Sequence, residues 1–138
     1  PNVIRYDGTN LEVIRETIQK VVDRASFEYF AEPKFQITDK RIGIGEPATL
    51  LNRVSVNYIA MLDNRIFDRS VKPLTIVLND PAIIQGWKDG IVGMKVGGTR
   101  VLVVPPSLAY GEKGLKPMIP PHATLTFEIE LVGISTLR

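Results

Sequence analysis

Hydrophobic residues near the start of the chain recur at the spacing of one helix face. They are Leu11, Ile14, Ile18, Val21, Val22 and Ala25. Thr9 and Glu12 have the spacing of a capping box, in which each side chain bonds a free amide of the first turn. The pattern predicts an amphipathic helix over residues 10–26, within an N-terminal helical extension of residues 1–33 that Pro33 terminates. Its apolar stripe either packs on the chain's own domain or forms a homodimer or partner contact.

From Phe35 onward the hydrophobic period changes to the two-residue alternation of half-buried strands. The clearest alternation lies over residues 124–131, where every odd position from Leu125 to Leu131 is apolar. Strands are predicted over residues 53–61, 74–78, 101–104 and 124–131, with one or two short strands in 35–44 and an extended segment at 66–68.

A second, shorter helical pattern follows Asn79-Asp80-Pro81, a sequence typical of a helix start. Its apolar face is formed by Ile84, Trp87 and Ile91. Gly90 and Gly93 are expected to bound this helix to two or three turns, too short to be stable alone, so it should pack on the sheet. Residues 34–138 are therefore predicted to form one α+β domain with about five antiparallel strands and one short helix.

Composition narrows the chemistry that this domain can perform. A net charge of +2 without a cluster of lysine or arginine argues against a nucleic-acid partner, and no apolar run approaches the ~20 residues of a membrane-spanning helix. The chain has no cysteine and a single histidine, His122, which excludes thiolate catalysis and cysteine-based zinc sites. Phosphate-loop, dinucleotide-binding and zinc-protease motifs are also absent. We predict neither a metal nor a cofactor.

The most informative stretch lies between the last two predicted strands. A loop rich in proline and glycine runs from Pro105 to Pro121 and contains Tyr110 and Ile119, and loops held by a rigid sheet are common binding sites. Five of the ten aromatic residues come from separate elements, namely Tyr58, Phe67, Trp87, Tyr110 and Phe127. They form either an ordinary aromatic core or an apolar concave site with Asp68 at its edge, an arrangement typical of small-ligand and peptide pockets.

Six short motifs follow one another in a recognisable order. They are Val56-Asn57-Tyr58, Ile66-Phe67-Asp68-Arg69-Ser70, Ile83-Ile84-Gln85-Gly86-Trp87, Gly93-Met94-Lys95-Val96-Gly97, Pro105-Pro106-Ser107-Leu108-Ala109-Tyr110-Gly111 and Ile119-Pro120-Pro121-His122-Ala123-Thr124-Leu125. In these motifs, their order and their spacing, the chain from about Phe35 to Ile134 resembles an FKBP-type peptidyl-prolyl cis-trans isomerase domain. The N-terminal helix lies outside the resemblance.

The resemblance implies a twisted antiparallel sheet wrapped around the short helix, and it implies a role for each pocket residue. The catalytic residues would be Tyr58, Asp68, Trp87, Tyr110 and Phe127. The substrate-binding residues would be Phe67, Leu74, Ile83, Ile84 and Ile119. Trp87 would be the floor beneath the prolyl ring and Ile119 the cover. The hydroxyl of Tyr110 and the amide of Ile84 would donate to substrate carbonyls, with Asp68 near the twisting amide.

Two of the departures from the family pattern bear directly on the pocket residues. Leu74 stands where the family often has an aromatic wall residue, so we expect that side of the pocket to be shallower. The arginine that commonly pairs with the aspartate is not plainly placed, and Arg69 is the candidate to replace it as the partner of Asp68.

The resemblance implies an isomerase of X-Pro bonds that stabilises a twisted amide without covalent chemistry and assists protein folding. The alternative is a non-catalytic FKBP-fold chaperone or docking module. Implied partners are proline-containing peptides, unfolded chains and macrolide immunosuppressants, whereas nucleic acids and membranes are not expected. Because the chain begins at Pro1, we expect a processed or trimmed N-terminus. The cytoplasm is slightly favoured, with export or an organelle left open.

Overall fold

The computed structural model describes residues 33–136. These residues belong to the unit Glu32–Arg138, the second of the two compact units into which the chain divides. The helix predicted over residues 10–26 lies outside the described residues and stays a prediction. Along residues 33–136, no helix has the length and apolar character needed to cross a membrane.

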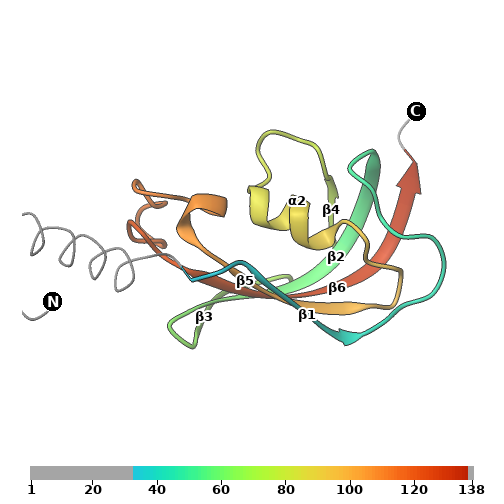
Figure 1. Cartoon of the computed structure of the whole chain (residues 1–138), viewed down its shortest axis with the longest axis horizontal. Helices are drawn as coiled ribbons and strands as arrows, with labels where there is room; N and C mark the ends of the chain where they lie inside the picture. The colour runs from blue at the N-terminus through green and yellow to red at the C-terminus, as the bar shows by residue number, and fades with distance from the viewer. Residues whose placement is uncertain (1–32, 137–138) are drawn as a thin grey trace, which may run out of the picture. The chain divides into compact units, whose positions relative to one another are not determined.

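The domain is built on one antiparallel sheet of six strands, one more than the sequence pattern indicates (Figure 1). The strands are β1 (Gln36–Arg41), β2 (Asn52–Leu62), β3 (Arg65–Arg69), β4 (Leu74–Val77), β5 (Thr99–Val104) and β6 (Leu125–Thr136). Their order across the sheet is β1-β5-β6-β2-β3, and β4 pairs with β2 beyond the end of β3. The predicted α+β class and antiparallel sheet are confirmed.

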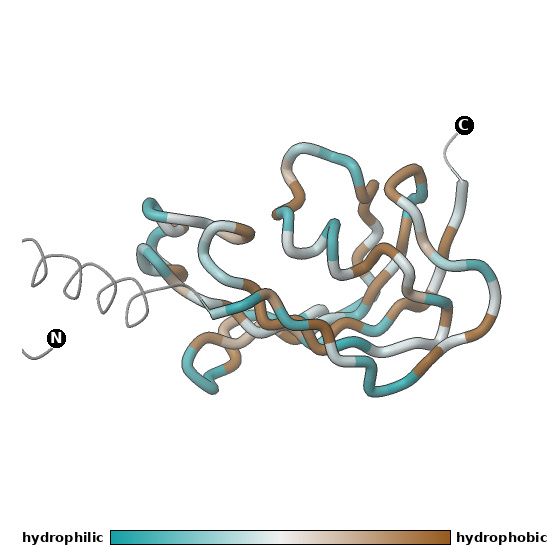
Figure 2. The backbone as a smooth tube through the Cα atoms, in the orientation of Figure 1, coloured by the Kyte–Doolittle hydropathy of each residue, from teal (hydrophilic) through white to brown (hydrophobic). Residues whose placement is uncertain are grey.

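Strict alternation gives the sheet two different faces. The odd-numbered residues of β6 from Leu125 to Leu131 are buried and the even-numbered ones only partly so. In β2 the buried positions are Val54, Val56 and Ala60. One face of the sheet, the inner face, therefore belongs to the core, and the other, the outer face, is open. Figure 2 shows apolar and polar residues interspersed along the strands and the loops alike.

The helix α2 (Gln85–Ile91) lies across the inner face, against β5 (Figure 1). Gly86 and Gly90 make this close approach possible, because a Cβ atom at either position would collide with the side chain of Val104 or Leu102. The helix has seven residues, about two turns, which agrees with the predicted length, and Gly90 is buried next to its last residue. Gly93 follows the helix with a φ of +91°, a conformation that favours glycine.

The predicted helix start at Asn79-Asp80-Pro81 is wrong. The carboxylate of Asp80 accepts a hydrogen bond from the amide of Ala82 at 2.9 Å, and its carbonyl accepts one from Ile83 at 3.0 Å. Aspartate bonding two residues ahead forms a local turn that competes with helix formation. The first helical residue is consequently Gln85, and Ile84 is the N-cap.

The far end of α2 is held by Arg100 of β5. Its Nη1 donates to the carbonyls of Gly90 and Val92, both at 2.9 Å, and its Nε donates to Asp39 of β1 at 2.7 Å. One guanidinium thus satisfies two carbonyls at the helix C-terminus, where a cation is electrostatically favoured. The helix is fixed to the sheet at the end opposite Ile84.

Candidate functional site

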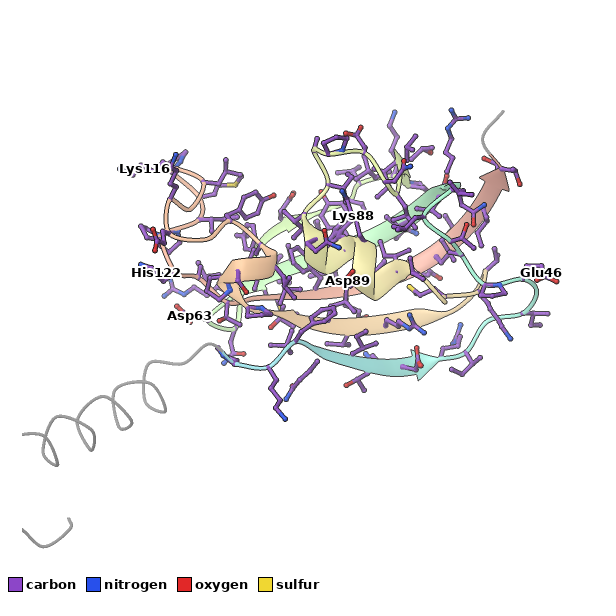
Figure 3. All side chains as sticks on the ribbon, turned by 45° about the horizontal axis from the view of Figure 1, so that its top comes forward. Glu46, Asp63, Lys88, Asp89, Lys116 and His122 are labelled. Atoms are coloured by element: carbon purple, nitrogen blue, oxygen red, sulfur yellow. The ribbon has the colours of Figure 1, made fainter. Side chains whose placement is uncertain are left out.

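A cavity of about 220 Å³ lies between the start of α2, the loop that follows β5, and the inner faces of β2, β3 and β6. Its lining residues are Tyr58, Ala60, Phe67, Asp68, Leu74, Ala82, Ile83, Ile84, Trp87, Tyr110, Leu115, Met118, Ile119 and Phe127. We call this cavity the pocket. In Figure 3 the loop residues Lys116 and His122 lie at one end of the domain, and Glu46 lies at the other.

All ten site residues predicted from the sequence line the pocket. The roles assigned to them stay predictions. Four lining residues were not predicted: Ala60, Ala82, Leu115 and Met118. Ala60 had a signal, because it stands two positions after Tyr58 on the same face of a strand. Leu115 and Met118 are apolar residues close to Ile119 in the same loop, which was the clue that the sequence offered. In the structure their side chains are exposed at the rim of the pocket.

Trp87 forms the centre of the pocket wall. Its ring meets Tyr58 edge-on, with centroids 5.3 Å apart and planes at 70°, and meets Phe127 at 5.5 Å and 89°. Trp87, Phe127 and Ile119 are all buried. Such edge-to-face pairs add about 0.5–1.5 kcal/mol beyond the burial of apolar area. The three aromatic rings are therefore fixed against one another before any ligand arrives.

Tyr58 and Asp68 face each other across neighbouring strands. The Tyr58 hydroxyl donates to Asp68 Oδ2 at 2.8 Å, and Asp68 pairs with Ala60 in the β2–β3 ladder. Burial of the phenol, followed by the hydrogen bond to the Asp68 carboxylate and its negative charge, raises the pKa of Tyr58 to about 12. Tyr58 therefore stays a neutral hydrogen-bond donor at any ordinary pH.

Arg69 does not pair with Asp68, contrary to the sequence expectation. Consecutive residues of a strand point to opposite faces of the sheet. Asp68 accordingly lines the pocket, whereas Arg69 lies on the outer face. Within residues 33–136 the hydrogen-bond partner of the Asp68 carboxylate is the Tyr58 hydroxyl, and no cation pairs with it.

Tyr110 reaches the pocket from a loop that is braced by its own backbone. The loop begins with the 3-10 helix η1 (Pro106–Leu108). Gly111 N–H then donates to Pro106 at 2.8 Å, and Leu115 and Ile119 exchange two hydrogen bonds of 2.7 Å. Burial, followed by the charge of Asp68, raises the pKa of the Tyr110 phenol above its ordinary value. The Tyr110 hydroxyl is thus held as a neutral donor in the lining of the pocket.

Two donors at the pocket have no acceptor among the residues that the structure describes. They are the Tyr110 hydroxyl and the backbone N–H of Ile84, the residue at which α2 begins. Both residues line the pocket, so the carbonyl groups of a bound ligand can accept hydrogen bonds from them. The indole nitrogen of Trp87 is buried and is likewise without a partner within residues 33–136.

The pocket suits binding better than covalent chemistry. Its lining contains one carboxylate, two tyrosines and otherwise apolar side chains, so none of its side chains is a serine, cysteine, histidine or lysine nucleophile. No group of three or more His, Cys, Asp or Glu side chains within the described part of the chain could hold a metal ion. The arrangement can enclose an apolar ring and offer hydrogen bonds to two carbonyl groups.

The family comparison agrees with this geometry. Residues 45–132 match the family model described as FKBP-type peptidyl-prolyl cis-trans isomerase. Among curated proteins, the 39 kDa FK506-binding nuclear protein of Drosophila melanogaster is 45% identical over 103 residues, which is 72% of this chain and 29% of that protein. An FK506-binding protein of Neisseria meningitidis serogroup A is 42% identical over 102 residues, covering 71% of this chain and 94% of that protein.

Two solved structures are similar as well. The crystal structure of AtFKBP13 has a TM-score of 0.67 and 34% identity, covering 73% of this chain and 93% of that one. The peptidyl-prolyl cis-trans isomerase of Pseudomonas syringae pv. tomato DC3000 has a TM-score of 0.68 and 28% identity, covering 96% of this chain and 100% of that one. The chain thus spans nearly all of some relatives and less than a third of others.

Proposed function

The chain belongs to the FKBP-type peptidyl-prolyl cis-trans isomerase family, its described domain is a peptidyl-prolyl isomerase, and we propose that the pocket is where it acts. The observation that supports this most is the set of three fixed rings, Tyr58, Trp87 and Phe127, beside two donors that have no acceptor within residues 33–136. An X-Pro segment offers what this arrangement lacks, because it combines an apolar ring with flanking carbonyl oxygens.

The reaction needs no nucleophile, because no bond is broken. Rotation about the amide is opposed by a barrier of about 18–20 kcal/mol that comes from resonance, and without a catalyst it takes tens to hundreds of seconds. In the twisted transition state, nitrogen and carbonyl are decoupled, so charge is less separated than in the planar amide. An apolar pocket from which water is excluded favours that state over the planar one, which is catalysis by differential binding.

Each group in the pocket then has a role in the proposal. The prolyl ring rests on Trp87, with Phe67, Ile83 and Phe127 as walls and Ile119 as the cover. The Tyr110 hydroxyl and the Ile84 N–H donate to substrate carbonyls. Asp68 orients the Tyr58 hydroxyl through their 2.8 Å hydrogen bond and places a carboxylate beside the rotating amide. Leu74, whose side chain is exposed, forms a low rim on one side.

The substrates we propose are proline-containing peptides and unfolded protein chains. Several relatives are named for binding FK506, and we propose that the same pocket also accepts macrolides of that type. The bulky residue before proline would contact the apolar rim formed by Leu115 and Met118. Assistance to protein folding follows if such chains are substrates while their X-Pro bonds are still accessible.

The test is the cis-to-trans rate of a series of short Xaa-Pro peptides in the presence of the wild type and of Asp68→Ala. We expect the wild type to accelerate isomerisation, with a preference for a bulky apolar residue before proline, and the variant to be slower. Both proteins should have the same circular dichroism spectrum, so that lost activity reports the site. A folded wild type that binds the peptides without acceleration would instead identify a docking module.

A further inference from the structure

A second depression is lined by side chains on the outer face of the sheet. In the ribbon view, α2 covers the other face (Figure 1). The depression is shallow, has a volume of about 650 Å³, and is lined by Lys40, Arg41, Asn57, Tyr58, Ile59, Arg69, Ser70, Val71, Thr99, Glu128 and Glu130. We call it the outer groove. Strand pairing places its residues on that face, because Asn57 pairs with Glu130 and Ile59 with Glu128, between the inward-facing pairs of β2 and β6.

Some charged side chains of the outer groove have an ion-pair or hydrogen-bond partner, and others have none within residues 33–136. Lys40 pairs with Glu128 at 3.1 Å, and Glu130 accepts a hydrogen bond from Asn57 at 3.1 Å. Both carboxylates therefore have partners. The exposed guanidinium groups of Arg41 and Arg69 have none among residues 33–136. The two groups without partners are cationic, so the groove is complementary to an anionic ligand.

Residues 67–74 border both the outer groove and the pocket. Phe67, Asp68 and Leu74 of this segment line the pocket, whereas Arg69, Ser70 and Val71 line the groove. Tyr58 contributes to both linings. Val71 stands almost fully exposed at the crest, where β3 has ended and β4 has not begun. A polypeptide that leaves the pocket at this edge can therefore continue onto the outer face.

We propose that the outer groove binds an acidic segment of the same polypeptide whose X-Pro bond occupies the pocket. This proposal rests on the proposed function. Arg41 on β1 and Arg69 on β3 lie on the same face but at opposite edges of the sheet, four inter-strand spacings apart. That separation is about 20 Å, the length of about six extended residues. An extended segment with acidic side chains about six residues apart can reach both guanidinium groups.

Binding in the groove should act on affinity rather than on the chemical step. Ser70 fixes the wall between the two sites, since its N–H donates to the Tyr58 carbonyl and its Oγ accepts from the Tyr58 N–H, both at 2.9 Å. The groove contacts are then the same for the planar and the twisted amide. Uniform binding of this kind lowers KM and leaves kcat unchanged.

The experiment compares two long peptides that share one X-Pro site and differ only in a segment of about six residues. One segment carries glutamates, and the other carries glutamines at the same positions. The pair of peptides is made twice, once with the segment before the proline and once with the segment after it. For the wild type we expect KM of the acidic peptide to be about fivefold lower in one of the two orders, the effect of two exposed ion pairs. The difference should shrink at high salt.

The variant Arg41→Glu/Arg69→Glu should abolish this preference and favour a matched lysine-containing peptide. The control variant is Arg53→Glu/Arg65→Glu, which changes net charge equally at exposed positions of β2 and β3 outside both sites. This control should keep the preference for glutamate. If both variants lose it equally, net charge explains the effect and the proposal is overturned.

A short Xaa-Pro tetrapeptide tests catalysis in the pocket separately from binding in the outer groove, because it is too short to reach the groove. If the wild type accelerates the tetrapeptide but treats the acidic and neutral long peptides alike in both orders, the groove proposal fails and the proposed function stands. If the wild type does not accelerate isomerisation of the tetrapeptide, the proposed function itself is overturned.

Discussion

Near Tyr58, strand β2 borders two different environments, the pocket on its inner face and the outer groove on its outer face. On the inner face, three aromatic rings line the pocket, where two hydrogen-bond donors have no acceptor among residues 33–136. On the outer face, carboxylates that already have partners lie between two arginines that have none in the described part of the chain, in an open and polar depression. The inner face can distinguish a twisted amide from a planar one, whereas the outer face can only add affinity. Changes on the inner face should therefore alter the isomerisation rate for every substrate.

The largest effect should come from Trp87→Ala on the inner face. The change removes both edge-to-face contacts and leaves a cavity in the core, so we expect the free energy of unfolding to fall by about 3–5 kcal/mol. Loss of the floor should also lower kcat/KM by about tenfold or more. Denaturant unfolding and the tetrapeptide assay measure the two effects. Trp87→Phe, which keeps an aromatic ring, is the variant to use if Trp87→Ala does not fold.

Tyr110→Phe should have a smaller effect, confined to activity. The variant keeps the ring and removes one hydroxyl that has no acceptor among residues 33–136, so the denaturation midpoint should not fall. Loss of one hydrogen bond to a substrate carbonyl should lower kcat/KM by about two- to tenfold. An unchanged kcat/KM in the folded variant would remove Tyr110 from the proposed mechanism.

The Tyr58–Asp68 pair predicts how the inner face responds to pH. Because the folded pKa of Tyr58 is raised to about 12 from its ordinary value of 10.0, its stabilising contribution is complete below pH 10.0. It is lost as the pH rises through about 12, since the unfolded chain releases the proton first. Ultraviolet titration of the phenolates should show a step at about pH 12 that is missing in Tyr58→Phe, whereas the step of Tyr110, whose pKa is also raised, should remain.

Asp68→Asn sharpens this test. It removes the carboxylate but leaves the burial that is the largest cause of the shift. The Tyr58 step should therefore move toward lower pH without reaching the ordinary value. A step that does not move at all would mean that the hydrogen bond to Asp68 has no influence on Tyr58.

The smallest effect should come from the outer face beyond both sites. Ser55 and Thr75 share a hydrogen bond of 2.8 Å between exposed hydroxyls of β2 and β4. We expect Ser55→Ala to change the free energy of unfolding by about 1 kcal/mol or less and to leave tetrapeptide and acidic-peptide kinetics unchanged. A large loss of activity would show that the outer face influences the isomerisation rate and does not only add affinity.

The sheet could be predicted because alternation is a local property of the sequence. Residues 124–131 have the clearest pattern, and β6 has the buried and partly buried positions that it indicates. Neither the start of α2 nor its packing could be predicted in the same way. Asp80 bonds the backbone of a turn instead of starting the helix, and Gly90 packs against Leu102, which lies close only in the folded domain.

The pocket was predictable to the extent that its residues belong to the motifs. All ten predicted residues line one cavity, although their roles await measurement. Arg69 was misplaced because the sequence places it next to Asp68, whereas the strand turns the two side chains to opposite faces. The outer groove gave no sequence signal, since its residues come from five strands and the β3–β4 connection and meet only when the sheet forms.

The most direct test of the account is to measure kcat/KM of Trp87→Phe and of Arg41→Glu/Arg69→Glu with both the tetrapeptide and the acidic long peptide. We predict that Trp87→Phe lowers kcat/KM of the two substrates by the same factor, about fivefold for a loss of about 1 kcal/mol. The double arginine variant should lower the value of the long peptide relative to the tetrapeptide. An unchanged kcat/KM in folded Trp87→Phe would contradict the claim that the inner pocket catalyses the rotation.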